Sequence, residues 1–117
     1  MFALDVLIPT FALPNALPGS AQYTFSISNT NAVLSIRGAK FVNTDSVART
    51  ITLHHVPAGG AAAAANKHFA AVSIPAGTTW EISYDEGEWT LRAGDSLWMF
   101  ADAASAVNAY FSGQLHE

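Results

Sequence analysis

Residues 49–56 have the sequence RTITLHHV, and this stretch indicates the fold class most directly. Ile51, Leu53 and His55 occupy every second position in it. A period of two places alternate side chains on opposite faces of a β-strand, so that one face can cover a core. The turn sequence VPAGG follows at residues 56–60. The stretch therefore predicts a half-buried strand that ends at a glycine turn.

Short alternating runs separated by turn residues continue on both sides of this strand. Further strands are predicted at residues 23–28, 33–42, 69–74, 80–84, 95–101 and 107–115. Alanine–glycine pairs end at Gly59, Gly77 and Gly94 with nearly even spacing, and glycine adopts the positive φ of tight turns at little cost. Gly38 lies inside a predicted strand and indicates a bulge. About seven such strands predict an all-β domain, a single small β-sandwich or jelly roll.

Two stretches have features of a helix. Residues 61–65 are all alanine, the residue with the highest helix propensity, but a double glycine precedes them. We expect a loop there with one turn of helix. Residues 101–111 fit either a strand or a helix, because Val107, Tyr110 and Phe111 have helical spacing while Val107, Ala109 and Phe111 alternate. We predict a strand.

Composition limits the functions available to the chain. It has 117 residues, of which 50% are hydrophobic and 12% charged, with a net charge of −4. This length allows one domain with one core, and the composition excludes extended disorder. The five basic residues are scattered, so we expect no nucleic-acid partner. There is no cysteine, which excludes disulfides and thiolate sites. The low charge density suggests that much of the surface faces another protein.

The first 20 residues differ from the rest and are predicted to form an extended apolar arm, with the sandwich spanning residues 21–117. Asp5 and three prolines interrupt the apolar run, which is too short and too broken for a membrane span and lacks the basic start of a signal peptide. The arm could lie on its own domain or dock on a neighbouring subunit. The predicted partner-binding residues are Phe2, Leu4, Leu7, Ile8, Phe11 and Leu13. We expect a chain without residues 1–17 to fold but to assemble poorly.

No motif for catalysis, metal binding or cofactor binding is found in the sequence. His54 and His55 are adjacent in a predicted strand, so they point to opposite faces and cannot bind one metal together. Asp85, Glu86 and Glu88 crowd one predicted hairpin turn, whereas a glycosidase needs carboxylates on both sides of a bond. The nucleophile elbow and the glycine-rich phosphate loops are also missing. We therefore expect no enzymatic activity, no cofactor and no metal.

Three tryptophans raise the alternative of sugar binding, because aromatic faces stack on sugar rings. Trp80 and Trp98 lie in alternating strands and are predicted to pack in the core. Trp89 follows the acidic turn and is expected to be the exposed one. It is the candidate glycan contact.

From about residue 23 to residue 114 the chain resembles small all-β structural proteins of tailed bacteriophages and prophages. The segments that carry the resemblance are FVNT (41–44), TITLHHVPAGG (50–60), AAN (64–66), IPAGTT (74–79), LRAGDSL (91–97), AASAVN (103–108) and SG (112–113). They consist of turns and strand alternation, and residues 1–22 lie outside them.

This resemblance implies a non-enzymatic virion component. The expected role is a capsid decoration or cement protein that binds other virion proteins, such as the major capsid protein. The alternative is a module of the tail, baseplate or fibre with a receptor- or glycan-binding role. Symmetric sites in a virion favour a homo-oligomer, most simply a trimer. The expected location is the virion.

Overall fold

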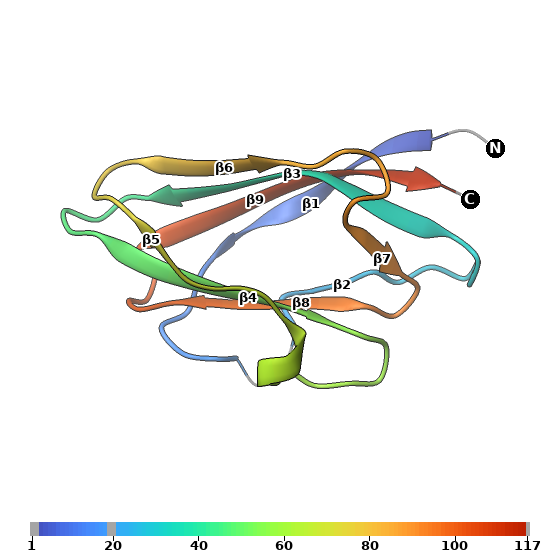
Figure 1. Cartoon of the computed structure of the whole chain (residues 1–117), viewed down its shortest axis with the longest axis horizontal. Helices are drawn as coiled ribbons and strands as arrows, with labels where there is room; N and C mark the ends of the chain where they lie inside the picture. The colour runs from blue at the N-terminus through green and yellow to red at the C-terminus, as the bar shows by residue number, and fades with distance from the viewer. Residues whose placement is uncertain (1–2, 19–20, 117) are drawn as a thin grey trace.

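The computed structural model describes residues 3–18 and 21–116, with the backbone alone for residues 3–11. Two antiparallel β-sheets face each other across one core (Figure 1). Within the described residues, the strands and one short 3₁₀ helix are β1 (Ala3–Ala12), β2 (Tyr23–Thr24), β3 (Val33–Asn43), β4 (Arg49–Val56), η1 (Ala64–Asn66), β5 (Lys67–Ile74), β6 (Thr79–Ser83), β7 (Thr90–Arg92), β8 (Ser96–Ala101) and β9 (Val107–His116).

The strand order identifies a jelly roll. The first sheet has the order β1-β9-β3-β6, with the short β7 also paired to β3, and the second has the order β2-β8-β4-β5. Most neighbours within a sheet are far apart in sequence, and the chain crosses repeatedly from one sheet to the other. Two interleaved antiparallel sheets of this kind are the jelly-roll solution to packing a small β domain. The expected all-β sandwich is confirmed.

Side-chain alternation builds the core between the sheets. In β4 the inward positions are Ile51, Leu53 and His55, as the sequence predicted, and Ile51 and Leu53 are fully buried. Phe41 of β3 contacts three other aromatic rings, those of Phe69, Trp80 and Phe111. The largest fully buried side chains are Phe41, Leu13, Leu34, Ile36, Ile51, Leu53, Ile74, Leu91, Leu97, Met99, Val56 and Val107.

The ambiguous stretch at residues 101–111 contains no helix. β8 ends at Ala101, a turn follows, and β9 begins at Val107. Val107, Ala109 and Phe111 are buried at alternate positions, so the strand prediction is confirmed. The alanine run also behaves as expected, with one turn of 3₁₀ helix at its end.

Residues 23–28 differ from their prediction, because only Tyr23 and Thr24 belong to a strand. The backbone of Phe25 bonds to the turn before β8 instead: its N–H donates to the carbonyl of Asp95, and its carbonyl accepts from the N–H of Gly94. These bonds satisfy the backbone without a ladder, which is why the alternating pattern there does not extend the sheet.

The predicted bulge at Gly38 is confirmed. The pairing of β3 with β9 shifts register between Ile36 and Gly38. A Cβ atom at Gly38 would lie 3.2 Å from the Ser112 hydroxyl, so glycine also permits the close approach of β9.

The N-terminal segment is an edge strand of the first sheet and not a separate arm. β1 pairs antiparallel with β9 from Ala3 opposite His116 to Ala12 opposite Asn108. The sequence predicted a separate arm at residues 1–20, whereas this pairing makes residues 3–12 part of the sandwich. Of the six predicted partner contacts, Phe2 lies outside the described residues, and Leu4, Leu7, Ile8 and Phe11 lie in β1. Leu13 is 1% exposed within the chain's own core, so it is unavailable to a partner.

A proline breaks the regularity of this edge strand. The register of β1 against β9 shifts between Ile8 and Phe11, and Pro9 lies inside that shift. Proline lacks the N–H that a central strand needs, and it is tolerated at an edge or a bulge. Natural sheets use such residues to keep an edge from pairing with another chain.

Candidate functional site

Polar side chains gather at the two ends of the sandwich. At the end where β4 finishes (right in Figure 1), residues from both sheets meet. We call this group the histidine cluster: His55 on the inner face of β4, His68 in β5, Tyr84 and Trp89 in the β6–β7 connection, and Asp95 in the turn before β8.

His55 is the centre of the cluster, and both of its ring nitrogens have partners. Its Nε2 lies 3.1 Å from Oδ2 of Asp95, and the indole Nε1 of Trp89 donates to its Nδ1 at 3.1 Å. An indole N–H can only donate, so Nδ1 must be the acceptor. The ring proton therefore lies on Nε2, where it donates to Asp95.

This arrangement includes the carboxylate–histidine pair of an acid–base site but leaves it no free nitrogen. A general base needs a lone pair directed at the proton that it removes. In His55 that lone pair is occupied by Trp89. Asp95 is also committed, because its carboxylate accepts from the backbone N–H groups of Ala58 and Arg92.

Trp89 is 4% exposed, so the prediction that it is the exposed tryptophan is wrong. The His68 ring stacks on it at 4.1 Å between centroids, and the Tyr84 ring packs edge-on at 5.1 Å. Its carbonyl also accepts from the N–H of Ile36, which ties the backbone to β3. With its indole face covered by histidine, Trp89 offers no platform for a sugar.

Trp80 and Trp98 were both predicted to pack in the core, but only one of them does. Trp80 packs partly buried against the core beside Phe41, as expected. Trp98 lies on the opposite face of β8 from the buried Leu97 and Met99, so it does not face the core. Its indole donates to the hydroxyl of Ser96 at 2.8 Å.

The outer part of the histidine cluster is less buried. Nε2 of His68 lies 3.1 Å from the Tyr84 hydroxyl. Burial of the ring against its aromatic neighbours lowers the pKa of His68, and the nearby His55 adds a smaller effect in the same direction. Burial raises the pKa of Tyr84, and the Glu88 carboxylate raises it further.

The acidic residues form the predicted turn between β6 and β7. Oε1 of Glu88 accepts from the N–H of Asp85 at 2.7 Å, and the N–H of Gly87 donates to the Ser35 hydroxyl. Glu86 lies 3.1 Å from Nε2 of His116 at the end of β9. The Glu88 carboxylate thus holds the turn, and the Glu86 carboxylate faces a histidine.

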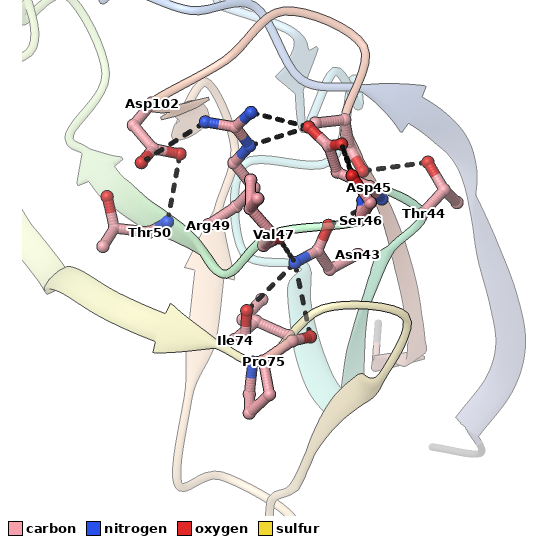
Figure 2. Close-up of polar contacts among 11 residues, drawn as sticks. Asn43, Thr44, Asp45, Ser46, Val47, Arg49, Thr50, Ile74, Pro75 and Asp102 are labelled. Carbon is pink, nitrogen blue, oxygen red and sulfur yellow. Dashed lines mark hydrogen bonds and ion pairs between the residues drawn. The ribbon is translucent and has the colours of Figure 1, made fainter.

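The opposite end of the sandwich is held by the buried amide of Asn43 (Figure 2). Its Nδ2 donates to the carbonyls of Val47 and Ile74 at 3.0 Å each and approaches that of Pro75 at 3.3 Å. Its Oδ1 accepts from the N–H of Asp45. One side chain therefore fixes two loops, and all of its atoms serve the fold.

Arg49 lies between two carboxylates at the same end (Figure 2). Its Nε and Nη2 both donate to Oδ2 of Asp45, at 2.9 and 2.7 Å, and Asp102 lies at 4.0 Å. The Arg49 guanidinium and the N–H of Ser46 hold the pKa of Asp45 below its ordinary value. This is an ion-paired loop anchor at the surface.

The adjacent histidines point to opposite faces, as predicted. The His54 ring lies on the outer face of β4 and is covered by the 57–66 loop, with Nδ1 2.9 Å from Oδ1 of Asn66. Across residues 3–18 and 21–116, no group of three or more His, Cys, Asp or Glu side chains is placed to hold a metal ion. The same residues contain no helix of the length and apolarity needed to cross a membrane.

Sequence reasoning missed the meeting of His55 with Asp95 and Trp89. Asp95 lies 40 positions after His55 in the sequence, and Trp89 lies 34 positions after it. The pairing of β4 with β8 brings Asp95 to His55, and packing between the two sheets brings Trp89 there, so no local pattern marks these contacts.

Comparison with known proteins supports the fold. No family model matches the chain, and no curated protein matches it. A solved structure described as "Bacillus endospore appendages form a novel family of disulfide-linked pili" is similar in fold, with a TM-score of 0.53 and 11% identity. The match covers 98% of this chain and 86% of that one. At this identity the likeness concerns the fold alone.

Proposed function

We propose that this chain is a non-enzymatic structural subunit of a bacteriophage virion, and that it decorates or cements the capsid. In this role the sandwich binds other virion proteins, the major capsid protein first among them. It does so as a homo-oligomer, most simply a trimer.

The observation that carries the proposal is the internal use of the groups that could do chemistry. Both ring nitrogens of His55 are bonded within the cluster, and the Asp95 carboxylate is shared with two backbone N–H groups. Asn43 and Arg49 are committed to loops at the other end. Such an arrangement stabilises a rigid body, which is what a subunit of a shell requires.

Two further points support assembly as the role. The sequence resembles small virion proteins over most of its length, and a structure of similar fold is described as belonging to the disulfide-linked pili of Bacillus endospore appendages. This chain has no cysteine, so its assembly would be non-covalent, unlike the disulfide-linked pili of that description.

The alternative role, a tail module that binds a glycan or receptor, depended on an exposed Trp89. The burial of this residue removes that support. A tail location remains an outcome of the test below.

Virion particles prepared with and without this chain test the proposal. Both are exposed to rising temperature or mild chaotrope, and released DNA is measured. We expect particles that lack the chain to open earlier, and adding the folded protein to restore their survival. Chain unfolded before addition is the control and should restore nothing. Equal survival of both kinds of particle contradicts a cement role, and recovery of the chain only with detached tails places it there.

A further inference from the structure

Three of the chain's four histidines contact one short segment, the connection between β6 and β7 at residues 84–89. His68 reaches it from β5 through the Tyr84 hydroxyl, His116 from β9 through Glu86, and His55 from β4 through the indole of Trp89. Histidine is the side chain whose ordinary pKa lies near neutrality, so this convergence couples one connection to pH.

The hydrogen bond between Trp89 and His55 depends on the protonation state of the His55 ring, because one partner must donate and the other must accept. The indole N–H donates and cannot accept, and Nδ1 of His55 can accept only while the ring is neutral. Protonation places a hydrogen on Nδ1, and two N–H groups would then face each other at 3.1 Å.

The other partner of the ring decides which residue moves. Asp95 accepts from Nε2 in both protonation states, and the imidazolium is attracted to its carboxylate. Asp95 is fixed by the N–H groups of Ala58 and Arg92. The protonated ring therefore stays on Asp95, and the indole is displaced.

We propose that the β6–β7 connection is a pH-sensitive latch, closed while His55 is neutral and released when His55 is protonated, because the buried indole of Trp89 then loses its acceptor. The inference rests on the cluster itself and holds whatever assembly the chain belongs to.

Some of the surrounding charged and titratable groups oppose release of the connection and others support it. The positively charged groups oppose it, because they repel a protonated His55. His68 of β5 stacks on the same indole and repels a second imidazolium at His55. From β3, Arg37 donates to the carbonyl of Tyr84 and adds positive charge nearby.

The carboxylates act in opposite ways. Asp95 attracts the protonated ring of His55, and the negative charge of Asp85 and Glu88 in the connection acts in the same direction, so these three groups support release. Glu86 opposes release, because it gains an ion pair when His116 is protonated. Glu86 is largely exposed, so its pair with His116 is screened by solvent and secures only the outer part of the turn.

Hydrogen exchange of the indole N–H groups, followed by NMR at about pH 8 and about pH 5, tests the latch. We expect the protection of the Trp89 indole, measured against free indole at each pH, to fall about tenfold or more on acidification. The Trp98 indole is the internal control, because its acceptor is the Ser96 hydroxyl, which does not titrate in this range. Trp89→Phe assigns the Trp89 signal.

Two variants separate the histidines. His55→Gln supplies an amide oxygen for Trp89 and an amide N–H for Asp95 without titrating, so it should abolish the pH response. His68→Gln should keep that response. Constant Trp89 protection in the unaltered protein, or a full response in His55→Gln, overturns the proposal.

A second measurement decides the matter if His55→Gln fails to fold. The ring ¹⁵N shifts of His55 in the unaltered protein report its protonation directly. Protonation at Nδ1 in step with the loss of Trp89 protection supports the latch. Protonation without that loss, or a ring that stays neutral at about pH 5, overturns it.

Discussion

Asn43 illustrates how single polar residues hold this sandwich together. It is 1% exposed, yet its amide serves carbonyls of two loops and one backbone N–H. Buried polar groups are tolerated only when they are hydrogen-bonded. Removing one such side chain therefore leaves several buried groups without a hydrogen-bond partner.

Asn43→Ala should therefore destabilise the fold strongly. Each backbone group left buried without a partner costs about 1–3 kcal/mol, and we expect a total loss near 3 kcal/mol in the free energy of unfolding. Chemical denaturation measures it. Asn31→Ala is the matched control, because this side chain is exposed, and it should change stability by less than about 0.5 kcal/mol. Equal effects of the two substitutions would show that Asn43 is not a structural anchor.

Two glycines separate backbone strain from steric conflict. Gly77 and Gly94 both have positive φ, at 64° and 90°. A Cβ atom at Gly77 meets nothing within 4 Å, whereas one at Gly94 would lie 2.8 Å from the Cβ of Ala58.

Gly77→Ala should cost about 1 kcal/mol, the penalty of a left-handed backbone alone. Gly94→Ala should cost at least about 1 kcal/mol more, because the added methyl is overpacked against Ala58. Adding Ala58→Gly to Gly94→Ala should recover the difference. Thermal or chemical unfolding of the four proteins checks this, and identical losses at the two glycines would argue against the close approach of these turns.

The sequence predicted single residues well only where a local pattern governs them. The opposite faces of His54 and His55 and the bulge at Gly38 follow from strand geometry, and both were found. Trp89 was mispredicted because its burial depends on His55, 34 positions earlier, and on a stacking ring from another strand.

At the scale of elements, β1 changes the meaning of the apolar N-terminus. Its pairing with β9 makes it part of the first sheet, and Leu13, just after it, is fully buried. The backbone N–H of Leu13 also donates to the carbonyl of Val107. We therefore expect that deleting residues 1–17 weakens the fold itself, in contrast to the expectation drawn from the sequence.

The same substitution at two leucines tests whether the N-terminal segment is part of the core. Leu13→Ala should lower the free energy of unfolding by about 2–5 kcal/mol, because it leaves a cavity in the core. Leu17, four residues later, is 46% exposed, and Leu17→Ala should change the free energy of unfolding by less than about 0.5 kcal/mol. Denaturant titration of both variants is sufficient. A small loss for Leu13→Ala would mean that this segment lies outside the core.

Most strands could be predicted because alternation and turn residues are local signals. β3, β4, β6, β8 and β9 lie close to their predicted positions. The shortness of β2 and the incorporation of β1 could not be predicted, since both depend on which distant backbone groups are available for pairing. Sheet order likewise required the whole chain to be assembled.

For the whole molecule, the pKa of His68 predicts a pH dependence of stability. In the folded protein it lies below the ordinary value of 6.5, so the unfolded chain binds more protons as the pH falls through this region. Stability should therefore be full above about pH 6.5 and decrease below it.

Urea denaturation at a series of pH values measures this effect. His68→Gln should show a shallower decrease below about pH 6.5 than the unaltered protein, and Lys67→Gln, a change at the neighbouring exposed position, should not. A steeper decrease in His68→Gln would reverse the assigned sign.

The most direct test of the central proposal is to locate the chain in intact particles. Purified virions that carry it are imaged by electron cryomicroscopy, and their protein content is determined by mass spectrometry. The proposal predicts the chain in stoichiometric amounts, with jelly-roll density repeated symmetrically on the outside of the shell. Particles that are complete without the chain, while the protein is found free and catalytically active, would contradict it.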